Sequence, residues 1–385
     1  MVVRKRVGLI FSYNENWIAG AYYILNIIHA LNTLDDSKKP ILVILTESAE
    51  NFSKVAVETK YPYLEHATFP FQKSSYSVLE RAINKLSRTI LDRKIIKKKI
   101  KAPLLDFVYP AQINKLPYKL KKVNWVPDFQ EDHLPNFFSR EEIQRRKKHQ
   151  KEVVAKGDIV VISSEDAKSD FLRLYPSTKA KSFVLHFAVT HPDFSDESID
   201  ALLKKYKLPK KYFFAPNQFW AHKNHNVVLK AVKYLKEKDI SVIVAFSGKE
   251  DDYRNAGNFK QLQTYIAEHG LEVQIRFLGF LPRMEQLCLF KQAQAIIQPS
   301  LFEGWSTVIE DAKALGKYVI ASNLAVHKEQ LTENVSFFDP NSPQDLAQSI
   351  ELFLSNAPEM SHFNYKTNIF EFGKRFKKLI QIATS

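Results

Sequence analysis

Short apolar runs rich in β-branched residues alternate with helical patterns along the first half of the chain. These runs cover residues 7–11, 41–45, 105–109, 123–126 and 159–163. Buried parallel strands separated by amphipathic helices produce this pattern, because the helices cover both faces of the sheet. The first half therefore predicts an α/β domain with a doubly wound parallel sheet.

A second series of such runs covers residues 212–215, 240–246, 273–278, 295–298, 318–321 and 335–338. We therefore expect two Rossmann-like domains, at residues 1–195 and 205–365, with the boundary between about His191 and Pro209. The pattern of the last segment, 366–385, predicts an amphipathic helix. One course open to this helix is a return to the first domain. Ligands of such sheets bind beyond the carboxyl ends of the strands, so the cleft between the domains is the expected site.

The composition is that of a globular protein with an excess of positive charge. Of the 385 residues, 45% are apolar and 25% charged, and the formal net charge is +14. No apolar run approaches the roughly 20 residues that span a bilayer. Basic clusters lie at residues 93–101 and 145–148. A solvated face, an anionic membrane surface or an anionic acceptor would each account for them, whereas nucleic acid is not expected without a recognisable binding module.

The location that we expect is the cytoplasm. Cys288 is the single cysteine, so it forms no intramolecular disulfide, which fits a reducing compartment. The N-terminal stretch is interpreted as a first strand, because it lacks the small-residue cleavage site of a signal peptide. A peripheral position at the inner face of the membrane is the alternative that the basic clusters leave open.

The strongest chemical signal lies in residues 298–317, which read QPSLFEGWSTVIEDAKALGK. A strand is followed by a loop with Gly304 and then by a helix for which Ser306 or Thr307 is a ready N-cap. Free amides at a helix N-terminus bind anions, and a diphosphate is the anion we expect there. Glu310, about one turn into the helix, is placed to accept hydrogen bonds from two ribose hydroxyls, and Glu303 is placed to face a donor sugar.

This segment resembles the paired-glutamate motif of the family 4 retaining glycosyltransferases, the glycosyltransferases group 1, whose common form is Pro-Ser-x-x-Glu-Gly-Phe-Gly. The resemblance implies the two-domain GT-B fold, with Glu303 on the sugar hydroxyls and Glu310 on the ribose. Six residues separate the two glutamates here, whereas seven is the commonest spacing in the family. The shorter loop leaves open which of Trp305, Ser306 and Thr307 presents its amide to the diphosphate.

A second match is the segment 217–225, NQFWAHKNH, after the first strand of the second domain. Lys223 resembles the family's lysine that neutralises the donor diphosphate. A site without a metal ion must supply this positive charge from side chains. The family's usual arginine is Gln218 here. Either His222 compensates for it, or the site relies on Lys223 alone.

A third match lies in the first domain. The segment 124–135 follows a predicted strand and resembles the family's histidine-bearing loop at the cleft. The resemblance places His133 near the reacting carbon or the diphosphate, with Asp128 or Asp132 to orient it.

Two glycine-containing turns resemble the family's nucleotide contacts more weakly. Gly279-Phe280-Leu281 resembles the turn that holds the nucleotide base through backbone groups. Gly20, at the start of the first long helix, resembles the glycine of the first strand-to-helix turn in sugar-nucleotide enzymes.

The resemblance implies a retaining hexosyltransferase that moves a sugar from a UDP- or GDP-sugar donor onto a glycan or lipid-linked acceptor. No Asp-x-Asp stands in the sequence and nothing else resembles a metal site, so we expect no metal and no other cofactor. A sugar-nucleotide 2-epimerase of the same fold is one alternative. A non-catalytic sugar-nucleotide binding protein is the other, suggested by Gln218 and by the short glutamate spacing.

Overall fold

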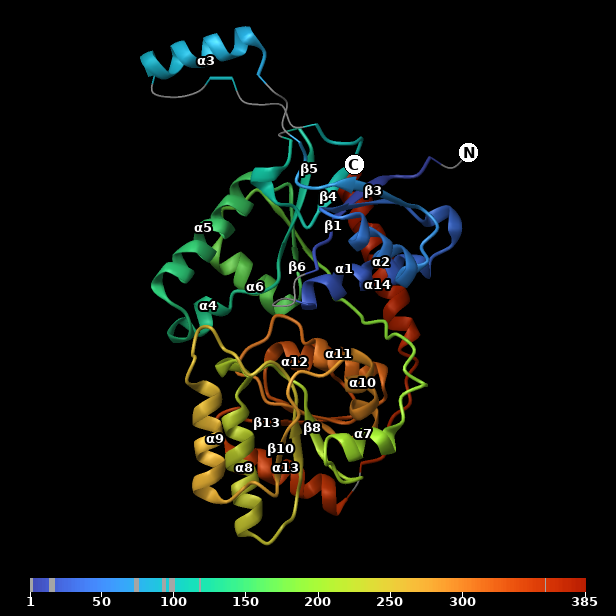
Figure 1. The fold of residues 1–385 in the computed structure, drawn as a ribbon, viewed down its shortest axis with the longest axis vertical. Helices are drawn as coiled ribbons and strands as arrows, with labels where there is room; N and C mark the ends of the chain where they lie inside the picture. The colour runs from blue at the N-terminus through green and yellow to red at the C-terminus, as the bar shows by residue number, and fades with distance from the viewer. Residues whose placement is uncertain are drawn as a thin grey trace.

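The computed structural model describes residues 3–13, 18–72, 76–91, 95–96, 101–117, 119–356 and 358–385. These residues form two parallel sheets with helices packed around them, one above the other in Figure 1. The α/β architecture with two doubly wound sheets, predicted from the alternating pattern, is confirmed. The chain passes from one sheet to the other between Val184 and Phe213.

The first sheet has the strand order β3-β2-β1-β4-β5-β6-β7. Its strands are β1 (Arg6–Ile10), β2 (Ile41–Thr46), β3 (Leu64–Thr68), β4 (Phe107–Tyr109), β5 (Lys121–Val126), β6 (Ile159–Ile162) and β7 (Lys181–Val184). Strand β6 is buried along its whole length, as a strand covered on both faces must be. The apolar runs miss the edge strands β3 and β7, because half-exposed edge residues form no continuous apolar run.

Helices of the first domain begin where the sequence supplies caps. They are α1 (Ile18–Asn32), α2 (Ala49–Thr59), α3 (Val78–Leu91), α4 (Gln130–His133), α5 (Arg140–Lys156) and α6 (Glu165–Leu174). The Ser139 hydroxyl accepts from the Glu142 amide at the start of α5, and Ser164 accepts from Ala167 at the start of α6. The N-terminus of α6 consequently lies at the carboxyl end of β6, on the side of the sheet where ligands bind.

The second sheet has the order β10-β9-β8-β11-β12-β13. Its strands are β8 (Phe213–Ala215), β9 (Val244–Phe246), β10 (Ile275–Phe277), β11 (Ile296–Gln298), β12 (Val319–Ser322) and β13 (Val335–Phe338). Its helices are α7 (Ile199–Lys205), α8 (His225–Glu237), α9 (Asn258–His269), α10 (Arg283–Gln292), α11 (Thr307–Ala314), α12 (Ala325–Gln330) and α13 (Pro343–Ser355). Each of these strands overlaps one of the predicted apolar runs.

The C-terminal helix α14 (Lys366–Thr384) packs on the first domain beside α1, and Figure 1 shows it in red running along that domain. Phe372, Phe376 and Leu379 are buried in the core of the first sheet. The two helices approach closely at Gly373, where a Cβ atom would lie 2.3 Å from the carbonyl oxygen of Ala30. The chain thus crosses between the domains twice.

The structure describes the two basic clusters to different extents. Of the segment 93–101, only Ile95, Ile96 and Lys101 belong to the described residues, so a membrane role for that segment stays a prediction. In the second cluster Arg146 is not a solvated charge, because its Nη1 lies 2.7 Å from Oε2 of the buried Glu131. Within the described ranges, no helix is both long and apolar enough to cross a bilayer.

We predict that Gly373→Ala lowers the thermal stability of the first domain. A methyl group against the Ala30 carbonyl forces α1 and α14 apart, and overpacking of this kind costs about 1–3 kcal/mol, more than the roughly 1 kcal/mol that alanine gains over glycine in a helix. The measurement is calorimetric unfolding. Gly257→Ala is the control, because the nearest atom to its Cβ would lie 3.7 Å away; equal melting curves for both variants would contradict the packing argument.

Candidate active site

Lys223 and Glu303, two of the residues singled out by sequence, form an ion pair at the carboxyl end of the second sheet. Lys223 lies in a short 3-10 helix after β8, and its Nζ is 2.6 Å from Glu303 Oε1 in the loop after β11. The same oxygen accepts hydrogen bonds from Gln298 Nε2 at 2.9 Å and Ser300 Oγ at 2.7 Å. Asn217 in turn donates to the Gln298 side-chain oxygen. The carboxylate of Glu303 is therefore held in one orientation by neutral donors as well as by the lysine.

The loop that carries Glu303 abuts the first domain. A Cβ at Gly304 would lie 2.5 Å from the Pro127 carbonyl oxygen and 2.9 Å from Cβ of Asp128, which follow β5. Only glycine permits this approach, so the carboxyl ends of the two sheets meet here. Burial raises the pKa of Asp128, although Arg146 acts in the opposite direction. A second carboxyl group thus lies near Glu303, at the end of the other sheet.

His133 lies at the end of α4, so part of the segment expected to be a loop is helical. Its Nε2 is 2.5 Å from Oδ2 of Asp170 on α6. Arg173 donates to both Asp170 and Asp132. The structure therefore corrects the expected partner: Asp170 orients His133, Asp132 acts only through Arg173, and Asp128 points toward Arg146.

The imidazole of His133 is brought close to the glutamate loop. Its ring centroid is 5.0 Å from that of Phe302, the residue before Glu303. Because Nε2 contacts the Asp170 carboxylate, Nδ1 is the ring nitrogen left for a further contact. Sequence reasoning missed Asp170, since a single acid on a helix far along the chain carries no local signal.

The start of α11 is tied to α12. Ser306 caps α11, its hydroxyl accepting from the Ile309 amide. The Ser306 amide, one of the three expected to face a diphosphate, donates to Gln330 Oε1 at 2.8 Å, and Gln330 Nε2 donates back to the Ser306 carbonyl. Of the three expected amides, those of Trp305 and Thr307 remain the candidates for anion contact.

Glu310 is buried and engaged on both carboxylate oxygens. Oε1 accepts from Lys313 and Gln330, and Oε2 accepts from the Tyr365 hydroxyl at 2.6 Å. Tyr365 lies where the chain returns to the first domain, and its hydroxyl also accepts from the Val189 amide. The predicted ribose contact of Glu310 stays a prediction, and it requires at least one of these protein partners to give way.

The next residue, Asp311, is an acid that sequence reasoning passed over although seven residues separate it from Glu303, the commonest family spacing. Arg283 donates to both its carboxylate oxygens, and His191 bonds to Oδ1 at 2.8 Å. Burial acts to raise the pKa of Asp311, but Arg283 and His191 lower it below the usual value. Asp311 is therefore a second candidate for the ribose contact.

The other predicted residues take varied positions. His222 is buried, and burial together with the nearby Lys223 charge puts its pKa well below the usual value, so it is uncharged near neutral pH. It therefore does not replace the charge of the arginine that is Gln218 here.

Gly279 has a positive φ of 68° and its carbonyl accepts from Gly248. The remaining predicted residues are Phe280, which is exposed, Leu281 in the apolar core, and Gly20, buried in the first turn of α1.

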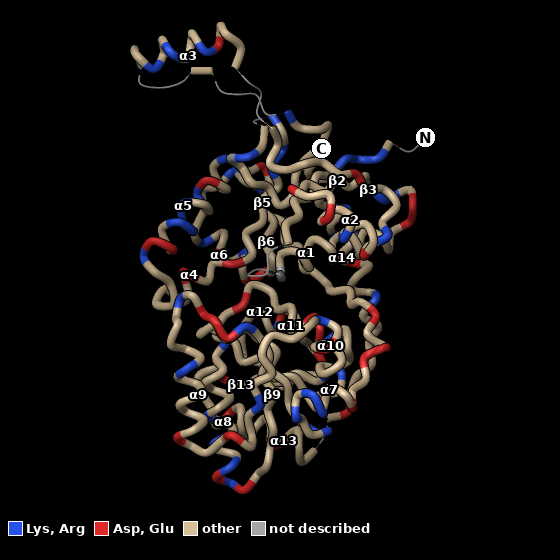
Figure 2. The backbone as a smooth tube through the Cα atoms, viewed as in Figure 1, with Lys and Arg blue, Asp and Glu red and all other residues tan. Residues whose placement is uncertain are grey.

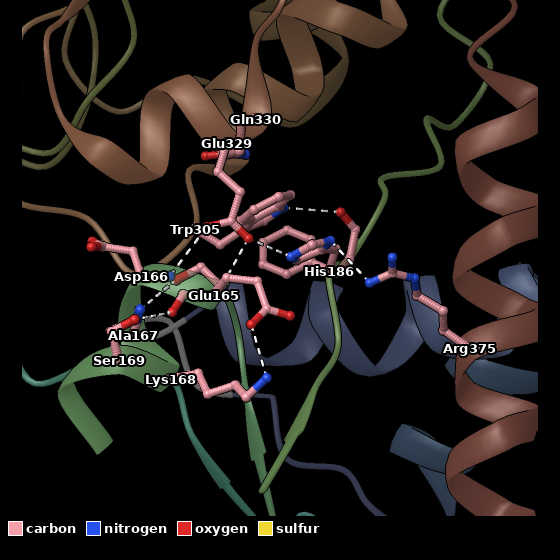
Figure 3. A network of polar contacts seen from close by, with 12 residues as sticks. Glu165, Asp166, Ala167, Lys168, Ser169, His186, Trp305, Glu329, Gln330 and Arg375 are labelled. Atoms are coloured by element: carbon pink, nitrogen blue, oxygen red, sulfur yellow. Dashed lines mark hydrogen bonds and ion pairs between the residues drawn. The ribbon is translucent and has the colours of Figure 1, made fainter. Parts of the chain in front are cut away.

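A network of polar contacts joins the two domains beside this site, as Figure 3 shows. Glu329, on α12 of the second domain, accepts from the amides of Glu165 and Asp166 at the N-terminus of α6. It also accepts from His186 Nε2 at 2.6 Å, and Arg375 donates to the other ring nitrogen. Burial acts to raise the pKa of Glu329, but His186 and the two amides lower it, so the carboxylate stays charged until the pH falls through that lowered value.

Trp305 connects the network to the glutamate loop. Its ring stacks on His186 at 4.4 Å between centroids, and its Nε1 donates to the Phe187 carbonyl (Figure 3). One of the residues expected near the diphosphate is thus held by the segment that leads out of the first domain.

The sequence of the second domain matches a known family. Residues 198–369 match the model of the glycosyl transferases group 1. This finding confirms the resemblance seen in the glutamate motif, while membership of the narrower family 4 stays a prediction.

Curated proteins similar to this chain include two O-antigen chain mannosyltransferases. The chain is 25% identical over 213 residues to RfbU of Salmonella typhimurium, which covers 55% of this chain and 56% of RfbU. It is 22% identical over 254 residues to O-antigen chain mannosyltransferase B of Escherichia coli, 64% of each chain. The match thus spans less than two thirds of either relative.

The crystal structure of Anabaena HepE in complex with UDP and glucose resembles the whole fold. The TM-score is 0.61 at 14% identity, over 99% of this chain and 96% of HepE. At this identity the likeness concerns the fold alone, and it confirms the GT-B arrangement of two domains.

We predict that Lys223→Met weakens binding of UDP or GDP about 10-fold or more, because a charge-assisted contact to the diphosphate is worth about 1.5–3 kcal/mol. Binding of the nucleoside alone changes less than about twofold. Isothermal titration calorimetry measures both. Lys233→Met, a surface lysine of α8 that pairs with Glu237, is the control. Equal loss of nucleoside and nucleoside diphosphate would remove Lys223 from the diphosphate site.

We predict that Glu329→Gln speeds hydrogen exchange at the amides of Glu165 and Asp166. The neutral amide of glutamine is a weaker acceptor for helix N-terminal amides than the carboxylate, and the contact to His186 weakens with it. Exchange mass spectrometry of the peptide spanning the start of α6 measures this. Glu333→Gln, an exposed acid of the same domain, serves as control. Unchanged exchange in both variants would mean that the two domains are not held together through Glu329.

Proposed function

We propose that this protein is a retaining glycosyltransferase that transfers a hexose from a UDP- or GDP-sugar to a glycan or lipid-linked acceptor without a metal ion. The observation that supports it most is the Lys223–Glu303 ion pair, which puts a cation and an oriented carboxylate together where the two sheets meet. A diphosphate requires the first and sugar hydroxyls the second. The glycosyl transferases group 1 domain that contains both residues supports the same activity.

We propose mannose as the sugar and a bacterial surface polysaccharide as the acceptor class. RfbU and mannosyltransferase B are both named O-antigen chain mannosyltransferases. HepE, which shares the fold, was crystallised with UDP and glucose, so the fold itself accommodates a nucleoside diphosphate.

In the proposed reaction the donor separates the ion pair. Lys223 turns to the diphosphate, and Glu303, still held by Gln298 and Ser300, accepts from the sugar hydroxyls. The bond from the anomeric carbon to the phosphate oxygen breaks with its electron pair on the phosphate, and the acceptor oxygen bonds to the same face of that carbon. The acceptor proton passes to the departing diphosphate, whose negative charge Lys223 stabilises. His133, fixed by Asp170, lies at the opposite wall, formed by the first domain.

Metal independence belongs to the proposal. Among the described residues, no three His, Cys, Asp or Glu side chains are grouped so that they could hold a metal ion. The charge of the diphosphate is then met by Lys223 and by backbone amides at the start of α11.

We predict that GDP-mannose raises the melting temperature of the purified protein more than other UDP-, GDP- or ADP-sugars, and that EDTA leaves this shift unchanged. A ligand at about 100 times its Kd adds roughly 2.7 kcal/mol of stability, which a thermal shift assay resolves. The donor that stabilises most is then incubated alone and with polysaccharide acceptors. Conversion of the donor into an epimer without acceptor would identify an epimerase, and donor binding with no product under any condition would identify a binding protein.

A further inference from the structure

Helix α3 projects from the first domain on the side away from the second domain, as Figures 1 and 2 show. Its start is fixed by its own sequence: the Ser77 hydroxyl accepts from the Glu80 amide, and the Glu80 carboxylate accepts from the Ser77 amide. This reciprocal pair is a capping box. The helix is therefore encoded locally, although it leaves the body of the protein.

Four apolar side chains of α3 face solvent. Val78, Leu79, Ile83 and Leu86 are 79%, 71%, 40% and 64% exposed. Leu79, Ile83 and Leu86 follow the i, i+4, i+7 spacing that puts residues on one face of a helix. An ordinary surface helix turns such a face toward the protein core. Here the face is exposed.

Two polar residues of α3 are covered instead. Asn84 and Ser87 are buried, and the Asn84 side chain bonds to both the amide and the carbonyl of Ile96 at 2.9 Å each. The backbone of Ile96 thus packs on a polar residue of α3, while the apolar face is left exposed. An exposed apolar face of this kind marks an interaction surface.

The charges along α3 indicate what it contacts. Arg81, Lys85 and Arg88 are its basic residues, and its single acid, Glu80, is used in the cap (Figure 2). With about 3.6 residues per turn, the three basic residues lie on the side of α3 opposite the apolar face, which is the arrangement of an interfacial helix with one charged and one apolar side. Anionic phosphates beside an apolar layer meet both requirements, because long basic side chains can reach the phosphates while the leucines enter the acyl region.

We propose that α3 is an interfacial helix that docks the protein on an anionic lipid bilayer, with Leu79, Ile83 and Leu86 toward the acyl chains and Arg81, Lys85 and Arg88 toward the phosphates. Since α3 lies beyond the end of the first domain, the docked protein holds the cleft clear of the bilayer (Figure 1). If the proposed transferase function holds, a lipid-linked acceptor reaches Glu303 only when its glycan is long enough to extend past the first domain. The enzyme then elongates chains rather than starting them on the lipid.

The docking is tested by sedimentation of the full-length protein with vesicles of phosphatidylcholine alone and with about one third phosphatidylglycerol, without donor or acceptor. Leu79→Gln with Leu86→Gln is expected to lower the partition coefficient on the anionic vesicles about tenfold or more. Val273→Gln with Leu352→Gln, equally exposed positions on the second domain, is the matched control and keeps wild-type binding. Because all four side chains are exposed, both variants are expected to fold, which the melting curve with and without nucleotide verifies.

A charge variant tests the choice of lipid. Arg81→Gln, Lys85→Gln and Arg88→Gln together are expected to abolish the preference for anionic vesicles and its sensitivity to salt. Equal sedimentation of wild type and the leucine variant would overturn the proposal, as would undiminished anionic binding of the charge variant. A wild-type dimer in solution that the leucine variant converts to a monomer would show that a second copy covers the face, and would also overturn it. These outcomes are separate from the transferase proposal, since donor binding is measured without vesicles.

Discussion

The loop after β11 meets the end of β5 so closely that only glycine fits at position 304. This contact sets the distance between the carboxyl ends of the two sheets, and so decides which side chains share the cleft. Glu303 and Phe302 are brought against Asp128 and His133 because the backbone of Gly304 touches the backbone of the other domain. A site assembled in this way exists only while the domains are together, since each supplies one wall.

Helix α12 transmits the relative position of the domains to the glutamate loop. Its consecutive residues Glu329 and Gln330 act on different parts of the protein: Glu329 binds the N-terminus of α6, and Gln330 binds both backbone groups of Ser306 at the start of α11. A short rigid helix cannot move one contact without disturbing the other. Separation of the domains would therefore remove a contact of the same short helix that holds Ser306, in addition to opening the cleft to water.

The sequence specified the fold and the local motifs well, and the partners of the motif residues poorly. Apolar runs predicted every strand of the second sheet, because buried parallel strands carry continuous apolar runs. No such run marked the half-exposed strand β3 of the first sheet. The spacing around Glu303 identified the loop. The role of Asp170 depends on a contact with His133, a residue 37 positions away in sequence, for which a single chain offers no pattern. The burial of His222, which removes its charge, is likewise a product of tertiary packing.

The neighbouring acids of α11 show how nucleotide binding and domain position become linked. Glu310 accepts from Lys313, Gln330 and Tyr365, and Asp311 accepts twice from Arg283 and once from His191. A carboxylate offers about four acceptor positions, so either acid has room for one ribose hydroxyl but must release a protein partner to accept two. Tyr365 and His191 lie on the two crossings between the domains. Release of these two partners would leave α11 itself intact. Such an exchange of partners would couple ribose binding to the crossings between the domains. The coupling would be reciprocal: the nucleotide weakens the contact that it replaces, and that contact weakens nucleotide binding by the same free energy.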